Sequence, residues 1–328
     1  MSAFLQIEDL SVHFPVRKGL LQRRVSAVRA VDQVTLSLNR GEAFGLVGES
    51  GCGKTTLARA VLRLVDPTSG SIWFDGQNVS TLNGTGLSPY RKKVAAIFQD
   101  PFSSLNPRMT SGQTLSEVLH VHRYGGSING RVVELLSLCG LAPRFADLHP
   151  HEMSGGQRQR VGIARALALE PELIVCDEPV SALDVSIQAQ IINLLEELRV
   201  KFGLTYLFIG HDLSVVRHLC NRLAVMYLGR IMETGTSDQL FSSPRHPYTK
   251  ALIEAVPAPD PEEQDMREHV ALAGEIPSPL NPPDGCVFHT RCPIAMEQCK
   301  KSVPPLSHLG GKHATACFAV QSEDPNRP

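Results

Sequence analysis

The spacing of apolar and polar positions changes several times along the chain, and each change predicts a different element. Residues 4–14 alternate loosely between apolar and polar side chains, which predicts a strand near a sheet edge. Residues 28–38 resume this pattern after a basic stretch, 15–24. We interpret that stretch as an exposed loop, with contact to lipid headgroups or a membrane partner as the less favoured alternative. Residues 43–47 are a continuous apolar run, which is typical of a buried strand.

Further along, residues 70–79 again predict a strand, closed by a turn at Asp75-Gly76. From about 101 to 168 the apolar positions follow a helical period, so we expect a helical insertion here rather than more sheet. Residues 91–98 lead into this insertion.

After the insertion, residues 173–176 and 204–210 are short apolar runs and predict two more buried strands, with a helix between them that extends to about Val200. The segments on either side of Gly229 predict a final hairpin. Strands that alternate with helices predict an α/β fold with a largely parallel sheet.

Composition excludes several classes of protein. The 328 residues are 42% hydrophobic and 20% charged, with a net charge of -1, so there is no basic excess for binding nucleic acid. No apolar run is long enough to span a bilayer. The N-terminal residues lack the pattern of a signal peptide, so we expect a cytoplasmic protein in which disulfides are disfavoured.

Residues 48–56 fit the phosphate-loop pattern G-x-x-x-x-G-K-[ST] between a predicted strand and a predicted helix. We call this segment the phosphate loop; its members are Gly48, Glu49, Ser50, Gly51, Cys52, Gly53, Lys54, Thr55 and Thr56. Glycines let backbone N–H groups turn toward phosphate, and a helix N-terminus adds positive potential. Lys54 would reach the β- and γ-phosphates of ATP, and the Thr55 hydroxyl would hold Mg²⁺. A chance match in a glycine-rich turn is the alternative.

Cys52 lies beside the predicted helix N-terminus. A thiol in that position can have a lowered pKa, which would make it reactive and let alkylation block ATP binding. The favoured interpretation is a small residue that simply fits the loop.

A second helix N-terminus follows Met153, where Ser154, Gly155, Gly156 and Gln157 open a helix. We call these four residues the signature segment. A helix start with glycines is an anion site, and one triphosphate rarely needs two of them within one molecule. The sequence therefore hints at a dimer in which each chain completes the site of the other.

Two carboxylates, Asp177 and Glu178, follow the apolar run 173–176. Ligands of parallel α/β sheets bind at the carboxyl ends of the strands. Asp177 would help to hold Mg²⁺, and Glu178 would polarise the attacking water as general base. His211 follows the next strand, 204–210, so strand order would set it beside Glu178, near the γ-phosphate. Paired acids at a solvated strand end and a structural histidine are the alternatives.

These motifs, in this order, resemble those of the ATP-binding subunits of ABC transporters over residues 4 to about 240. The resemblance implies an ABC-type nucleotide-binding domain of the P-loop NTPase class. Such a domain has a mixed sheet core, an edge antiparallel β subdomain and a helical insertion. Met153 departs conservatively from the usual Leu.

The same resemblance implies roles for single residues. Phe14 would stack on adenine, although its position alone fits a core residue equally well. Asp184 would cross the dimer interface, and His211 would be the switch histidine. Gln99 would sense the γ-phosphate, couple to the membrane subunits and join Thr55 and Asp177 at Mg²⁺.

Within that family the chain most resembles the second ATPase of dipeptide and oligopeptide importers, the DppF and OppF type. The segments that carry this resemblance are 106–108, 226–230, 244–249 and 274–283. It implies a nucleotide-binding domain, 1–243, and a small loop-rich C-terminal domain, 244–328, with a cysteine cluster. The expected partners are a homologous ATPase subunit, two transmembrane permease subunits and, indirectly, an extracytoplasmic peptide-binding protein. The protein would lie peripherally on the cytoplasmic face of the inner membrane.

Four of the 8 cysteines crowd the C-terminal end with the spacing C-x5-C-x6-C-x17-C: Cys286, Cys292, Cys299 and Cys317. The close C-x2-4-C pairs of zinc sites are missing. Pro293 is a natural helix start, and an unbroken helix to Cys299 would separate Cys292 from Cys299 by about 10 Å along its axis. A shared metal therefore requires that helix to break early or bend.

Similar importer subunits are understood to hold a [4Fe–4S] cluster on such cysteines, so the resemblance implies one here, with a structural role. Zinc, unligated thiols and a disulfide pair stay open, as does redox sensing. The cargo also stays open, since glutathione, haem or nickel chelates fit the family as peptides do. The rivals to a transporter subunit are a soluble ABC-type ATPase and a degenerate regulatory half of the dimer.

Overall fold

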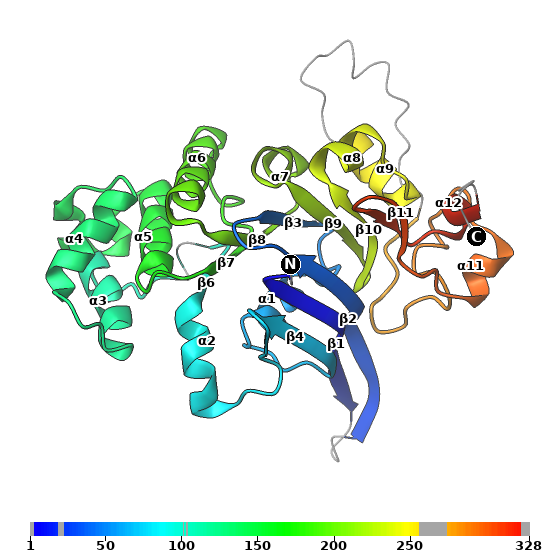
Figure 1. Ribbon diagram of the computed structural model, residues 1–328, viewed down its shortest axis with the longest axis horizontal. Coiled ribbons are helices and arrows are strands. Elements are labelled where there is room, and N and C mark those ends of the chain that lie inside the picture. Colours follow the sequence, from blue (N-terminus) through cyan, green and yellow to red (C-terminus); the bar gives the residue numbers. More distant parts are fainter. Residues whose placement is uncertain (1–2, 19–22, 101, 103, 256–273, 323–328) are drawn as a thin grey trace, which may run out of the picture. The chain divides into compact units, whose positions relative to one another are not determined.

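The computed structural model describes residues 3–18, 23–100, 102, 104–255 and 274–322 (Figure 1). The chain divides into two compact units. The first unit combines Met1–Leu38, Phe44–Ser80 and His211–Pro328, and the second combines Asn39–Ala43 with Thr81–Gly210.

The first unit contains an antiparallel sheet with the strand order β2-β1-β4-β5. Its strands are β1 (Leu5–Lys18), β2 (Arg23–Leu38), β4 (Ser69–Phe74) and β5 (Gln77–Asn78). The loop predicted over 15–24 is wrong at both ends, because Pro15 pairs with Ala27 and Arg17 with Arg24. Hairpin pairing satisfies the backbone whatever the side-chain charge, so the strands continue through the basic positions. The segment left between them, 19–22, lies outside the described residues.

The same unit contains strands in the order β11-β12-β10-β9-β3. Strand β3 (Ala43–Val47) pairs in parallel with β9 (Arg222–Tyr227), which forms a hairpin with β10 (Arg230–Thr236). The predicted hairpin around Gly229 is therefore confirmed, but it is not the last. The C-terminal region adds β11 (Ser307–Gly310) and β12 (His313–Thr315), and β12 pairs with β10.

The helices of this unit are short. They are α1 (Lys54–Val61), α7 (Leu213–Leu219), α8 (Ser237–Ser242), α9 (Pro247–Glu254), α11 (Glu297–Lys301) and α12 (Phe318–Ser322). The helix predicted to start at Pro293 begins at Glu297 instead, so no unbroken helix joins Cys292 to Cys299. The helix start predicted at Pro293 is therefore wrong.

An aromatic cluster anchors the C-terminal region within this unit. Phe288 is fully buried, and its ring centroid lies 5.3 Å from that of Tyr227 and 5.4 Å from that of Tyr248. Tyr227 ends β9 and Tyr248 lies in the first turn of α9. Burial of rings this large is a main source of stability. The segments 247–254 and 286–288 therefore share a core with β9.

The second unit contains the parallel strands β6 (Val94–Ile97), β7 (Leu173–Asp177) and β8 (Thr205–Gly210), with β7 in the middle. Every residue of β8 is buried, as its apolar run predicts. The 3-10 turn η1 (Gly84–Leu87) and α2 (Ser88–Lys93) precede β6, and α6 (Val185–Phe202) connects β7 to β8. The predicted strands and the helix between them are confirmed.

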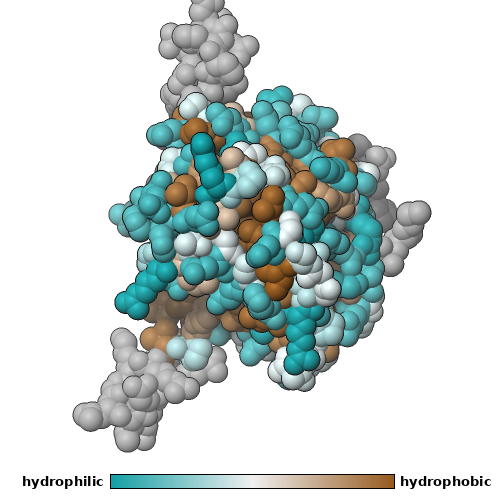
Figure 2. All heavy atoms as spheres, turned by 90° about the vertical axis from the view of Figure 1, so that its left-hand side faces the viewer, coloured by the Kyte–Doolittle hydropathy of each residue, from teal (hydrophilic) through white to brown (hydrophobic). Residues whose placement is uncertain are grey.

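The predicted helical insertion is present in this unit. It comprises α3 (Ser111–Val121), α4 (Ile128–Leu138), η2 (Pro143–Asp147), η3 (Pro150–Glu152) and α5 (Gly155–Leu167). The face that carries α3 and α4 is turned toward the viewer in Figure 2, where apolar side chains lie among polar ones. Val121 on α3 and Val133 on α4 are both exposed. Among the described residues, no helix is long and apolar enough to cross a membrane.

Candidate nucleotide site

The phosphate loop lies in the first unit, between buried strand β3 and helix α1. Gly53 occupies the N-cap of α1 with φ 111, a conformation that L side chains rarely adopt. A Cβ at Gly53 would lie 2.0 Å from the Ala30 carbonyl oxygen, and one at Gly48 would lie 2.1 Å from the Met226 carbonyl oxygen. Backbone from β2 and β9 therefore packs directly against the loop, and only glycine fits at these two positions.

Lys54 is buried, and its ammonium group donates to the carbonyl oxygens of Gly48 (2.7 Å) and Glu49 (3.0 Å). The lysine therefore curls back over its own loop. A positive charge held there, at the N-terminus of α1, suits a polyanionic ligand. This placement is compatible with phosphate binding by Lys54, which stays a prediction.

Glu49 connects the phosphate loop to the C-terminal region. Its backbone N–H donates to the Tyr248 hydroxyl (2.9 Å). Its carboxylate accepts two hydrogen bonds from Arg291, to Oε2 (2.8 Å) and Oε1 (3.3 Å). Burial by itself lowers the pKa of Arg291, but the hydrogen bonds with Glu49 and Tyr227 outweigh it and raise the pKa above its ordinary value. Arg291 is therefore a permanent cation at this position.

Sequence reasoning missed both Tyr248 and Arg291 as residues of this site. They lie 199 and 242 positions from Glu49 along the chain, and no local pattern connects them to it. The signal that could have found them was their place in the segments that carry the importer resemblance and beside the cysteine cluster.

The structure does not support a reactive Cys52. Its side chain is buried, and burial raises the pKa of the thiol, although the charge of Lys54 opposes the shift. The Cys52 carbonyl accepts a hydrogen bond from Gly229 N–H (2.8 Å). The lowered pKa is therefore wrong, because desolvation outweighs the effect of the helix terminus.

Asp177 and Glu178 lie at the carboxyl end of β7 in the second unit, as predicted. Glu178 has φ 48, an uncommon left-handed conformation for a residue with a side chain. Its N–H donates to the Ile209 carbonyl (2.9 Å), and its own carbonyl accepts from the Ser181 hydroxyl (3.1 Å). Backbone strain that the surroundings hold in place clusters at active sites.

Gln99, which follows β6, meets Glu178 directly: its side-chain amide donates to Glu178 Oε2 (3.0 Å). Gln159 on α5 donates to the Pro179 carbonyl (2.6 Å), which ties the same strand end to the helix of the signature segment. The second unit therefore gathers the predicted acids and Gln99 at one edge of its sheet.

The signature segment begins α5 with a capping box. The Gln157 N–H donates to the Ser154 hydroxyl (3.3 Å), and the Ser154 N–H donates to the Gln157 side chain (2.9 Å). Ser154 is exposed. Asp184, at the N-cap of α6, is exposed as well. Both are placed as a contact with a second chain requires, and that contact stays a prediction.

His211 follows the last residue of β8 and is exposed. Strand β8, which precedes His211, lies next to β7, which precedes Glu178. The predicted strand order is therefore confirmed. Asp212 then caps α7 by accepting from the backbone N–H groups of Ser214 (2.8 Å) and Val215 (3.4 Å). The switch role of His211 stays a prediction.

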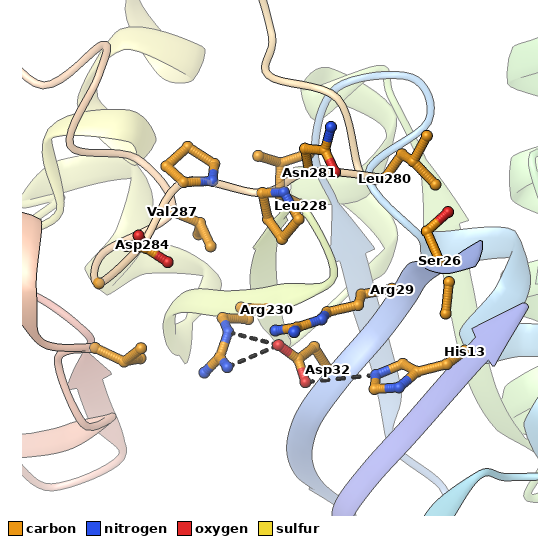
Figure 3. Close-up of a pocket in the computed structure, with 15 residues that line it drawn as sticks. His13, Ser26, Arg29, Asp32, Leu228, Arg230, Leu280, Asn281, Asp284 and Val287 are labelled. Atoms are coloured by element: carbon orange, nitrogen blue, oxygen red, sulfur yellow. Dashed lines mark hydrogen bonds and ion pairs between the residues drawn. The ribbon is translucent and has the colours of Figure 1, made fainter. Parts of the chain in front are cut away.

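Phe14 is an exposed aromatic on β1, opposite Val28 of β2. Its neighbour His13 pairs with Arg29 and lines a cavity of about 710 Å³ (Figure 3). Successive strand residues face opposite sides of a sheet, so the cavity and Phe14 lie on opposite faces. The cavity is separate from the predicted adenine contact.

Figure 3 shows the charged group in this cavity. Asp32 accepts two hydrogen bonds from Arg230 (2.7 and 3.1 Å), and His13 Nε2 lies 3.6 Å from its other oxygen. Leu280 and Asn281 of the C-terminal region line the side that faces these residues. The sequence did not predict this cavity.

The four C-terminal cysteines lie close enough for their charges to interact. Burial, together with the smaller influence of the Cys299, Cys292 and Cys317 thiols, raises the pKa of Cys286 to about 11. None of these four cysteines, all within the described residues, forms a disulfide, so the disulfide alternative is wrong. The described residues contain no group of three or more His, Cys, Asp or Glu arranged to hold a metal ion. The thiols as placed therefore do not form a ligand set.

The donors predicted for Mg²⁺ fit that ion better than the C-terminal thiols fit a metal. Thr55 in the first turn of α1 offers a hydroxyl, Asp177 a carboxylate and Gln99 an amide oxygen. These are the hard oxygen donors that Mg²⁺ prefers. The predicted ligand set stays a prediction.

Comparison with known proteins gives two family matches. The family described as "ABC transporter" matches residues 31–181, and "Oligopeptide/dipeptide transporter, C-terminal region" matches residues 232–299. The oligopeptide transport ATP-binding protein AppF of Bacillus subtilis is 53% identical over 95% of this chain and 96% of its own length. The putative oligopeptide transport ATP-binding protein YkfD of the same organism is 50% identical over 98% of this chain and 96% of its own.

Solved structures agree with the fold. The ATP-binding cassette MJ0796, a dimer in a post-hydrolysis state with ADP and Pi, has a TM-score of 0.63 and 28% identity. The alignment covers 71% of this chain and 98% of that one. The cbiO1 protein of Clostridium perfringens has the same TM-score at 26% identity, over 74% of this chain and 92% of its own. The predicted ABC cassette fold, with its antiparallel β subdomain and helical insertion, is confirmed.

Proposed function

Because this chain belongs to the family of ABC-type oligopeptide transport ATP-binding proteins, we propose that it hydrolyses ATP to power the import of dipeptides or oligopeptides. The observation that carries the hydrolytic part is the strained Glu178 at the end of β7, hydrogen-bonded to Gln99. The match of residues 232–299 to the peptide-transporter C-terminal region supports the class of cargo.

In this proposal the phosphate loop binds the triphosphate through its backbone N–H groups and Lys54. Phe14 stacks on adenine. Thr55, Asp177 and Gln99 would hold Mg²⁺, which would supply positive charge to the phosphates when bound. Glu178 accepts a proton from the attacking water, and Gln99 holds its carboxylate in place until the γ-phosphate arrives.

A second ATPase subunit completes each site. The exposed Ser154 and Asp184 support this part of the proposal, since a helix start that is already capped can still offer N–H groups to a ligand on another chain. Resemblance favours a homologous subunit over a second copy.

The membrane partners are two permease subunits, and the protein lies peripherally at the cytoplasmic face of the membrane. The segment after Gln99 is suited to transmit motion to them, because α5 holds it. Arg165 donates to the Ser104 carbonyl, and the Arg158 guanidinium lies 3.6 Å from the centroid of the exposed Phe102 ring. We also propose that residues 1–243 form the nucleotide-binding domain and 244–328 the C-terminal domain.

The Glu178→Gln variant tests the hydrolytic role. The amide cannot accept the proton of the attacking water, so we expect normal ATP binding and a turnover lower by about a hundredfold or more. ATPase activity of the complex with its permease subunits gives the turnover. Glu297→Gln is the matched control. Glu297 is an exposed carboxylate that pairs with nearby Lys300, and it lies far from Glu178 along the chain. Near-normal turnover by Glu178→Gln would remove Glu178 from its role.

We further propose that the C-terminal cysteines bind a [4Fe–4S] cluster. The mutual influence of their charges supports this by placing the four thiols near one another, although the thiols as placed do not form a ligand set. Anaerobic purification should yield brown protein with stoichiometric iron. Colourless, iron-free protein contradicts the proposal, and bound zinc would identify the other metal.

A further inference from the structure

The phosphate loop carries an acid where it would receive a polyanion. Glu49 is the second residue of the loop, and its carboxylate is only 24% exposed. A carboxylate in a partly desolvated place repels a triphosphate more strongly than one in water does. Something must neutralise Glu49 if this loop is to bind ATP tightly.

Arg291 supplies that charge. It reaches Glu49 with both terminal nitrogens, and its side chain is only 5% exposed, so the pair is screened little by solvent. The Tyr227 hydroxyl lies 3.4 Å from Nη1 and helps to hold the guanidinium. The two parallel hydrogen bonds fix the direction of the Glu49 side chain as well as its charge.

Tyr248 fixes the backbone of the same residue. Its ring is fully buried in the aromatic cluster with Tyr227 and Phe288, so its hydroxyl has a fixed position from which to accept the Glu49 N–H. Side chain and backbone of Glu49 are thus each held by a residue from beyond position 243.

We propose that Arg291 and Tyr248 are positioning residues for ATP binding, through which the C-terminal region neutralises Glu49 and sets the conformation of the phosphate loop. The C-terminal region then acts on the nucleotide site of its own chain. ATP affinity depends on it even though neither residue is expected to touch the nucleotide.

Arg291→Met tests the neutralisation, because methionine keeps much of the buried volume and removes the charge. We expect the Kd of ATP for the full-length chain to rise about tenfold. The rise should be smaller for ADP, which carries less charge. In the assembled complex KM for ATP should rise while kcat changes little, since Glu178 and the second unit are untouched.

The double variant Glu49→Gln with Arg291→Met separates neutralisation from general damage. Once the acid is gone no cation is needed, so the double variant should bind ATP at least threefold more tightly than Arg291→Met alone. Arg291→Lys should recover part of the affinity, because it keeps the charge but loses the fork. Lys300→Met is the matched control, an exposed cation of the same region that pairs with Glu297 and should leave the Kd unchanged.

Tyr248→Phe keeps the buried ring and removes only the acceptor of the Glu49 N–H. We expect a rise of about threefold in the Kd of ATP. This variant also decides the matter if Arg291→Met does not fold. Wild-type ATP affinity in Arg291→Met, wild-type affinity in Tyr248→Phe where Arg291→Met does not fold, or a double variant as weak as Arg291→Met would overturn the proposal.

Discussion

The phosphate loop and the signature segment are both helix N-termini rich in glycine, yet they are built in different ways. The phosphate loop is fixed by residues far along the chain: Gly229 donates to it, Tyr248 accepts from it and Arg291 pairs with its acid. The signature segment is fixed by itself, through a capping box that spans four residues.

This difference shows that the two parts of the predicted site depend on the rest of the chain to different degrees. A loop held by long-range contacts forms only when its whole unit folds, so it is preset before nucleotide arrives. A self-capped helix start needs no such support and can stay exposed. The three predictions that follow test this contrast, in order of expected effect.

The largest effect should come from Gly53→Ala. A Cβ there would meet the Ala30 carbonyl oxygen at 2.0 Å, and φ 111 is unfavourable for alanine. The loop and β2 cannot both keep their places, so we expect ATP binding to be lost and stability to fall by about 4 kcal/mol. Isothermal titration with ATP and chemical denaturation measure the two losses.

Gly51→Ala is the matched control within the same loop. Gly51 also has a positive φ, 78, but no atom lies within 4 Å of its Cβ position. Only backbone strain remains, which should cost about 1 kcal/mol. Equal losses in the two variants would show that long-range packing does not hold the loop.

Acid should destabilise the phosphate loop and α9 before it affects the start of α5. Burial lowers the pKa of His246 to about 4. Burial raises the pKa of Glu233, but the hydrogen bond from His313 and the backbone N–H bonds from Arg245 and His246 outweigh it and lower that pKa. Below pH 6.5 the unfolded chain protonates His246 while the folded chain does not until about pH 4. Stability therefore falls as pH falls through this window, by up to about 3 kcal/mol from His246.

Denaturation midpoints between pH 7.5 and 4.5 measure this loss, and hydrogen exchange locates it. Amides of the phosphate loop and α9 should lose protection, whereas the start of α5 should keep it, because Ser154 and Gln157 do not titrate. The His246→Asn variant should flatten the pH dependence. A pH dependence as steep as that of the wild type after this change would contradict the assignment to His246.

The smallest effect should come from Ser154→Ala. Removal of the cap should cost about 1 kcal/mol of stability. The full-length chain should keep its affinity for ATP, because its phosphate loop does not depend on Ser154. Turnover of the assembled complex should fall, since the partner's nucleotide loses a ligand. Weakened ATP binding by the single chain would place Ser154 in its own site and break the contrast.

Local patterns predicted much of this molecule. The phosphate loop, the acids after β7 and the capped start of α5 are each contiguous, so spacing alone identifies them. The strands around Gly229 follow from their apolar runs. The loop predicted over 15–24 is wrong at 15–18 and 23–24, because side-chain charge says little about backbone pairing.

Long-range contacts could not be predicted in this way. Arg291 and Tyr248 act on Glu49 across most of the chain, and the buried thiol of Cys52 responds to packing rather than to its helix. The pairing of β12 with β10 joins residues some eighty positions apart. No local period encodes such partners.

That last pairing has a consequence for any attempt to produce the cassette without its C-terminal region. Strand β10 carries the buried apolar residues Ile231 and Met232, and β12 covers its outer side with Glu233 opposite Thr315. A chain cut after residue 243 would leave β10 as an open edge with unpaired N–H and C=O groups. Such an edge invites strands from other molecules. The short β12 therefore protects the protein from aggregation as much as it completes the sheet.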